Sequence, residues 1–222
     1  MRTPITKDRL KTHFTYSWWK YAVGVLACLL VWNLFFSVTR TKAPEDKKME
    51  LYVYGNVYEA PLDALLETMR QNEFPDQAEF DCYVMTPDTT SGIQSFTVRV
   101  GTGDGDLLLV TRDVYESFAQ QGVFQDLDSL EGVRAALASQ GVTIDPARDY
   151  WKGKDGQSRF YGIPTARLAV LNAYIVPDGN EYYLCVRVDN GNEDVTRRVL
   201  ISLIENWTSG ENAMTVTEAL NP

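Results

Sequence analysis

One uncharged, apolar stretch constrains the whole chain. It runs from Tyr21 to Thr39, nineteen residues without a formal charge, and is closed by Lys20 before it and Arg40 after it. A helix rises about 1.5 Å per residue, so a stretch of this length crosses roughly the ~30 Å hydrocarbon core of a bilayer. A buried helix of a soluble core would need a polar face, and Asn33 is the only strongly polar member here. The sequence therefore predicts a transmembrane helix over residues 21–39.

The flanking sequence favours a retained anchor over a removed signal peptide. No small-x-small cleavage site follows the apolar run, since Pro44 would come directly after the nearest candidate cut. The triplet ending at Cys28 resembles a bacterial lipoprotein box, but the chain stays apolar beyond it, which disfavours lipid attachment. Basic residues lie on both sides and barely discriminate the orientation. A short basic N-terminus ahead of one apolar run and a long domain is typical of a signal anchor, so we expect residues 1–20 to be cytoplasmic.

The rest of the chain predicts one acidic extracellular domain. Residues 40–50 have the composition of a linker, and residues 51–222 have a usual single-domain length. From Thr41 onward there are fifteen Lys and Arg against twenty-nine Asp and Glu. This excess of acid argues against nucleic acid as a partner of the domain, and equally against an anionic lipid surface.

The first half of the domain alternates strand and helix patterns. Residues 51–54 and 79–85 have strand patterns, and an apolar stripe from Leu62 to Met69 predicts a helix between them. A strand, a helix and a strand imply a parallel crossover. Residues 91–105 alternate as a strand does, but they stand where a crossover helix is needed, and we interpret them as helix.

A buried strand and its following helix come next. The all-apolar run that ends at Val110 predicts a strand covered on both faces. Thr111 is placed to cap the helix that follows, and Gly122 is placed to end it.

The second half predicts further helices and two hairpins. Asp128 and Gly141 bracket a helix, and KDGQ predicts a hairpin turn leading to RFYGIP. The runs at residues 168–176 and 181–188 predict two strands joined by PDGN, a strong hairpin signal. A last helix is expected at residues 194–207.

The order of these motifs resembles a known family. The segment GDGDLLLVTRDVYESFAQQGVFQDLDSLEG, followed by KDGQSRFYGIP, is similar to extracellular solute-binding proteins of ABC importers, particularly the sugar-binding type. Members of that family have two lobes that close on a ligand, and the stretch after YGIP is too short for a second one. The resemblance therefore implies one three-layer α/β lobe, half of a type II periplasmic binding protein, with a transmembrane helix in place of the usual lipid tether.

Candidate ligand-binding residues follow from this architecture, because ligands of open α/β sheets sit beyond the carboxyl ends of the strands. Trp151 is added as an aromatic that could stack on a ligand. The candidates are Gly55, Asn56, Tyr58, Thr111, Arg112, Trp151, Pro164, Thr165 and Arg167. Structural roles are the alternatives, namely turn formation for Gly55 and Asn56, helix capping for Thr111 and rim packing for Tyr58.

The sequence argues against catalysis. The single histidine, His13, precedes the apolar stretch, so the outer domain has no imidazole for a Ser-His-Asp device or a zinc site. The glycines at residues 101–105 precede a strand and predict a turn, not a phosphate loop. The acids at residues 104–106 and 189–194 lack the spacing of a calcium loop. We expect no enzyme, no cofactor and no metal.

Two further cysteines fall in strand-like apolar runs. Cys82 and Cys185 could form one disulfide in an oxidising compartment. Buried free thiols are the simpler expectation.

Two function classes follow from the sequence. The first is a single-pass, membrane-anchored module that binds a small solute such as a sugar, weakly, in sensing or as an accessory to an ABC importer. Its partners would be the membrane, through residues 21–39, and a transporter or other membrane protein. The alternative is a non-catalytic scaffold or assembly protein with a vestigial pocket.

Overall fold

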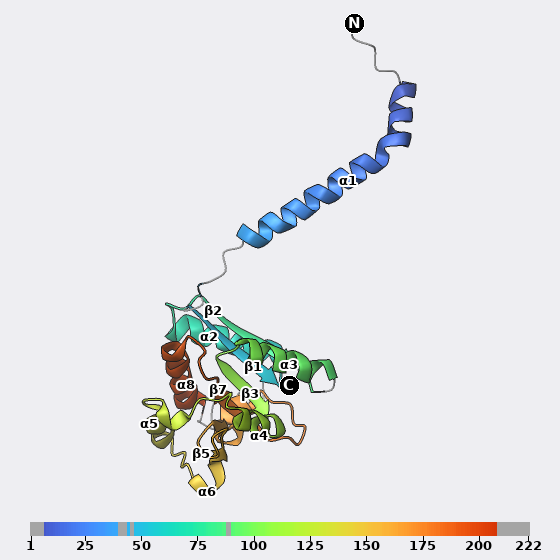
Figure 1. The fold of residues 1–222 in the computed structure, drawn as a ribbon. Helices are drawn as coiled ribbons and strands as arrows, with labels where there is room; N and C mark the ends of the chain where they lie inside the picture. The colour runs from blue at the N-terminus through green and yellow to red at the C-terminus, as the bar shows by residue number, and fades with distance from the viewer. Residues whose placement is uncertain (1–6, 40–43, 45–46, 88–89, 208–222) are drawn as a thin grey trace. The chain divides into compact units, whose positions relative to one another are not determined.

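The structure is a computed structural model that describes residues 7–39, 44, 47–87 and 90–207. The chain divides into two units, residues 1–42 and residues 43–222. The first unit contains helix α1 (Lys7–Thr39), and the second is a mixed α/β domain (Figure 1).

Helix α1 is longer than the predicted span. It begins at Lys7, and its segment Trp18–Phe36 is long and apolar enough to cross a bilayer, alone among the helices of the described residues. The large apolar side chains of this segment are exposed, up to 70% for Trp32, and Asn33 is exposed among them. No polar face divides them, which suits a helix surrounded by lipid. Insertion across a membrane, and its direction, stay predictions.

A five-stranded mixed sheet forms the middle of the domain, with strand order β2-β1-β3-β7-β6. Strand β1 pairs in parallel with β2 and β3, whereas β7 runs antiparallel to both β3 and β6. Strands β4 and β5 form a separate hairpin. The bounds are β1 (Lys48–Tyr54), β2 (Glu79–Met85), β3 (Leu107–Thr111), β4 (Trp151–Lys152), β5 (Ser158–Arg159), β6 (Gly162–Pro164) and β7 (Tyr182–Val186).

Helices cover both faces of this sheet. One face packs against α2, α5, α7 and α8, and the other against α3 and α4. The helices are α2 (Glu59–Glu73), α3 (Thr90–Thr102), α4 (Arg112–Gln121), η2 (Leu127–Ser129), α5 (Val133–Ser139), α6 (Pro146–Asp149), η3 (Thr165–Arg167), α7 (Ala169–Ala173) and α8 (Glu193–Trp207). The three layers agree with the predicted α/β class.

The parallel crossovers that the sequence predicts are confirmed. Strands β1 and β2 are joined through α2, and β2 and β3 through α3. Most of the ambiguous stretch at residues 91–105 is helical, since α3 extends to Thr102, and Phe96 and Val100, one helical turn apart, are both buried on one side. All five residues of β3 are buried, as expected for a strand covered on both faces.

The two faces have different cores. Leu107 and Leu109 of β3 point into the larger core, which is mainly aliphatic. Leu108 and Val110 point the other way, into a core rich in aromatic rings such as Phe96. Alternate strand residues thus feed opposite cores. Fully burying each such side chain contributes about 1.5–3 kcal/mol.

The predicted hairpin at residues 168–188 is wrong in its first strand. Residues 168–176 begin with Leu168, which follows η3, and then form helix α7 in place of the predicted strand. Within the described part of the chain, their only β-type pairing is an isolated bridge between Ile175 and Val57. Leu168, Val170 and Leu171 are buried against the larger core. A short apolar run is equally compatible with a buried helix and a buried strand, and its place in the core decided for helix. The second strand exists as β7, but it pairs with β3 and β6.

Some element ends also differ from expectation. Strand β1 begins at Lys48, inside the predicted linker, because Lys48 and Met49 extend the pairing with β2. Thr111 precedes α4 but makes no side-chain capping hydrogen bond, whereas Gly122 ends that helix in the left-handed conformation, with φ of 77°. The helix predicted between Asp128 and Gly141 is present but shorter than expected, and it consists of α5 alone.

Cys82 and Cys185 are free thiols, as expected. They lie on β2 and β7, which are separated by β1 and β3, and they face opposite cores. Three strand spacings of about 4.8 Å separate them by roughly 14 Å, beyond the reach of a disulfide. Burial raises the pKa of the Cys82 thiol to about 12 and that of Cys185 well above its usual value.

Candidate ligand-binding site

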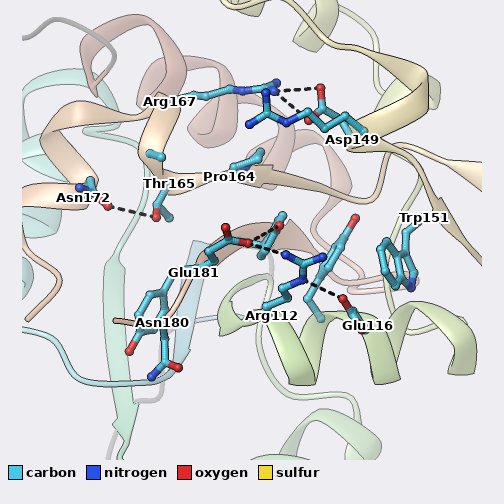
Figure 2. A pocket seen from close by; sticks show the side chains of 15 residues that line it. Arg112, Glu116, Asp149, Trp151, Pro164, Thr165, Arg167, Asn172, Asn180 and Glu181 are labelled. Carbon is cyan, nitrogen blue, oxygen red and sulfur yellow. Dashed lines mark hydrogen bonds and ion pairs between the residues drawn. The ribbon is translucent and has the colours of Figure 1, made fainter. Parts of the chain in front are cut away.

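A pocket of about 330 Å³ opens where β3 and β6 end and β7 begins. Its side chains come from α4, α6, β4, η3, α7 and the start of β7, so the sheet edge gathers residues far apart in sequence (Figure 2). We call it the Trp151 pocket. Its polar and charged lining includes Arg112, Glu116, Arg148, Asp149, Thr165, Arg167 and Glu181, and Trp151 lines it as well.

One side of the Trp151 pocket is formed by Arg148, Asp149 and Arg167, which we call the arginine wall. Arg167 Nη2 donates to both carboxylate oxygens of Asp149, at 2.8 and 2.9 Å, and its Nη1 donates to the Thr143 carbonyl at 3.0 Å. The Asp149 side chain is only 3% exposed. Its Oδ2 also accepts the Asp145 backbone amide at 2.7 Å. This pair, in which one guanidinium nitrogen reaches both oxygens of a buried carboxylate and another nitrogen reaches a carbonyl, holds the guanidinium in one orientation.

A second side is formed by Arg112, Glu116 and Glu181, which we call the glutamate wall. Arg112 Nε donates to Glu116 Oε1 at 2.8 Å, and Arg112 Nη1 donates to Glu181 Oε2 at 2.9 Å. The hydrogen bond to Glu116 and that to Glu181 raise the pKa of Arg112 further above its usual value. Tyr183 donates its hydroxyl to Glu181 at 3.3 Å. The Arg112–Glu181 ion pair is more exposed than the Arg167–Asp149 pair, so solvent screens it more.

Aromatic rings lie between these charges. Tyr115 of α4 stacks on Tyr183 of β7, with ring centroids 4.3 Å apart and planes within 5°. The Trp151 ring lies against Tyr115, with ring centroids 6.3 Å apart and planes inclined at 55°. Burial raises the pKa of the Tyr115 hydroxyl far above its usual value, so this ring stays neutral. The rings offer an apolar surface to a solute, and the walls offer polar groups that can orient it.

Five of the nine residues proposed from sequence line the Trp151 pocket. They are Arg112, Trp151, Pro164, Thr165 and Arg167. Thr165 is buried and donates its hydroxyl to the Asn172 side chain at 3.3 Å. Thr111 lies instead in an open groove of about 470 Å³ between α3 and α4.

The remaining three lie elsewhere, at the carboxyl end of β1. A Cβ added to Gly55 would come within 2.1 Å of the Tyr182 ring, so that ring occupies the space above the strand end. The Tyr182 hydroxyl accepts the Asn56 backbone amide at 3.1 Å and donates to Asp178 at 2.7 Å. Tyr58 precedes α2 and donates its backbone amide to the Tyr174 carbonyl at 2.9 Å. The space between β1 and β3 is therefore filled by the chain itself.

Sequence reasoning missed several pocket residues. Glu181 and Tyr183 were hidden by the incorrect hairpin, which assigned their strand to another partner. Arg148 and Asp149 stand in a short helix with no periodic pattern. The one usable signal was Pro146 after Asp145, since Asp145 caps α6 by accepting the Ala147 amide at 2.9 Å.

The described residues contain no group of three His, Cys, Asp or Glu side chains that could hold a metal ion. Asp106, one of the acids weighed for calcium, instead accepts the Glu50 backbone amide at 2.9 Å. The Asn190 side chain accepts the Asn192 amide at 2.9 Å, in a turn before α8.

Comparisons with known proteins give limited matches. No family model matches the chain, and no curated protein does. One similar solved structure is an N-glycan transport solute binding protein (NgtS) from Streptococcus pneumoniae in complex with Man5GlcNAc, with 20% identity, a TM-score of 0.37, and coverage of 53% of this chain and 24% of that one. Another is the uncharacterized protein lmo0859 from Listeria monocytogenes EGD-e, with 13% identity, a TM-score of 0.37, and coverage of 53% and 28%. The chain thus spans about a quarter of the length of either structure.

Proposed function

We propose that the chain is a single-pass, membrane-anchored module whose extracellular α/β domain binds a small polar solute in the Trp151 pocket. The observation that carries this proposal is the pocket itself, in which a partly buried indole and a tyrosine stack lie between two sets of hydrogen-bonding side chains. Apolar rings beside a few oriented polar groups are the usual make-up of a small-molecule site. A role in sensing, or beside an ABC importer, fits a binding module held at the membrane.

The anchor is proposed from the composition of α1. Its apolar segment has the length of a bilayer core, and the basic residues before it suit a cytoplasmic N-terminus. Reporter fusions at the two ends test this arrangement. We expect the N-terminus to report from the cytoplasm and the C-terminus from outside, and a cytoplasmic C-terminus would contradict the proposal.

Binding should be weak, because the pocket is open and one domain leaves much of a ligand in water. Burial of apolar area contributes only ~25 cal/mol per Å². We therefore expect dissociation constants near the millimolar range, about −4 kcal/mol.

The direct test is ligand-observed NMR on the full chain in lipid nanodiscs, titrated with neutral sugars and with short peptides. Trp151→Ala should abolish binding with little change in melting temperature. Tyr58→Ala is the matched control, since Tyr58 was proposed from the same pattern but does not line the pocket. A submicromolar affinity would contradict an open site formed by one domain. No response to any solute would favour the scaffold alternative.

A further inference from the structure

The charges of the Trp151 pocket are divided between its two walls. The arginine wall carries two guanidinium groups and one carboxylate, and the glutamate wall carries one guanidinium and two carboxylates. Figure 2 shows the Arg167–Asp149 pair well apart from the Arg112, Glu116 and Glu181 group, with Pro164 and Thr165 between them in the view. The pocket therefore has a positive side and a negative side.

The positive charge of the arginine wall is available to a ligand. Asp149 is fully engaged by Arg167 and by the Asp145 amide. The Arg148 side chain is exposed and makes no hydrogen bond or ion pair within residues 7–39, 44, 47–87 and 90–207. Its planar guanidinium can bind a carboxylate by donating two parallel hydrogen bonds to it.

The negative charge of the glutamate wall is available as well. Glu116 and Glu181 share a single arginine, and each uses only one carboxylate oxygen in that contact. The other oxygen of each can accept a hydrogen bond from an ammonium group. Tyr183 shares the oxygen of Glu181 that Arg112 already holds, so it leaves the second oxygen open.

The net negative charge of the whole domain disfavours some classes of ligand. From Thr41 onward acids outnumber bases by twenty-nine to fifteen, which disfavours a free anion at long range. A molecule with one positive and one negative group has no net charge, so it avoids that penalty and still satisfies both walls. An α-amino acid carries both groups on one carbon and presents them together, whereas the walls stand apart (Figure 2).

We infer that the Trp151 pocket selects zwitterions whose ammonium and carboxylate groups are separated along a chain, and that short unblocked peptides are its ligand class. The carboxylate lies on Arg148, the ammonium on Glu181 and Glu116, and the peptide side chains on Trp151 and the tyrosine stack. A cavity of about 330 Å³ accommodates only a few residues. This inference rests on the proposed function and names its substrate class.

The test uses four forms of one peptide on the full chain in nanodiscs: trialanine, its N-acetyl derivative, its C-terminal amide, and the form blocked at both ends. Ligand-observed NMR should give the tightest binding for free trialanine. Each block should weaken binding about three- to tenfold, since it removes one partly screened ion pair. The doubly blocked form should bind most weakly.

Variants assign each charge to its wall. Arg148→Gln should remove the preference for a free carboxylate and keep the preference for a free amine. Glu181→Gln, which leaves Glu116 in place, should weaken the preference for a free amine and keep the preference for a free carboxylate. Arg197→Gln on α8 removes one positive charge outside the pocket, as Arg148→Gln does within it, and should keep both preferences.

The outcomes separate this inference from the proposed function. Equal binding of all four peptide forms, or unchanged preferences in Arg148→Gln, would overturn the inference. Binding of a neutral sugar such as maltose, without any peptide binding, would overturn the inference and leave the proposed function standing. A failure of sugars and peptides alike would overturn both.

Discussion

The two ends of the central sheet each have a buried aspartate, and these two side chains have different hydrogen-bond partners. At the pocket end, Asp149 is paired with the Arg167 guanidinium through two hydrogen bonds. At the opposite end, Asp106 precedes β3 and is 5% exposed, and its Oδ2 accepts the Glu50 backbone amide at 2.9 Å. Burial raises the pKa of Asp106 to about 6. The buried acid at the pocket end thus has a charged partner, whereas at the other end burial outweighs the hydrogen bonds of Asp106 and raises its pKa.

This difference makes the pocket end of the sheet the better place for a binding site. A site that orients charged solutes needs charged side chains that are held in place, and ion pairing holds them at the pocket end. The far end contributes mainly to joining β1 and β3, because Asp106 of one segment caps the backbone of the other.

Asp149→Asn should destabilise the domain most, by about 3 kcal/mol, because it leaves the Arg167 guanidinium half-buried without its charged partner. Chemical denaturation of the full chain measures the change. Asp155→Asn, at the exposed β4–β5 turn, is the control and should have almost no effect. Equal effects of the two variants would mean that burial does not strengthen the Asp149 pair.

Asp106→Asn should change how stability depends on pH. The folded-state pKa of about 6 lies above the ordinary value of 3.8, so the folded state binds more protons between these values. Stability from this group is present below about pH 4 and is lost as pH rises through about 6. The variant should lack this loss and be more stable than the parent at neutral pH by about 2 kcal/mol. Parallel slopes for both proteins in denaturation series from pH 4 to pH 7 would contradict the expectation.

Gly55→Ala should destabilise by about 1–2 kcal/mol, because the new Cβ meets the Tyr182 ring at 2.1 Å and the ring must move. Gly101→Ala is the matched control in α3, where nothing lies within 4 Å, and it should stabilise by up to about 1 kcal/mol. Thermal denaturation of both variants compares the signs. A neutral Gly55→Ala would show that Tyr182 does not fill the β1 end in solution.

Glu116→Gln should have the smallest effect, a shift in melting temperature of about 1 °C or less, because the pair with Arg112 is exposed to solvent. The same thermal measurement, made with and without added salt, checks it. A shift as large as that of Asp149→Asn would mean that the two walls are equally buried in solution.

Much of the fold could be predicted from sequence because its signals are local. The stripe from Leu62 to Met69 has the period of a helix, and the run at β3 is short and follows turn glycines, which favours a strand. The stretch at residues 168–176 could not be assigned, because its apolar residues suit a helix or a strand and only the surrounding core decides. Strand order across β3, β7 and β6 depends on contacts between distant segments, which no local pattern encodes.

The candidate site was harder to predict than the fold. The rule that ligands sit at strand ends pointed to Arg112, Pro164, Thr165 and Arg167, and these do line one pocket. It also pointed to Gly55 and Asn56, where Tyr182 fills the space from a strand more than a hundred residues away. Pairing of Asp149 with Arg167 likewise depends on the fold, so the charge of each wall could not be read from composition.

The position of β7 has a consequence for how the domain is made. Strands β1, β2 and β3 can pair as soon as they leave the ribosome, but the free edge of β3 has no partner until Tyr182 and the residues after it arrive. About seventy residues separate the two strands, which takes roughly 4–14 s at ordinary rates of synthesis. Throughout that interval an apolar strand edge is open to other chains. Truncation before β7 should therefore yield an aggregation-prone product, and slow delivery of the C-terminal part should lower the yield of folded protein more than any single substitution at the pocket.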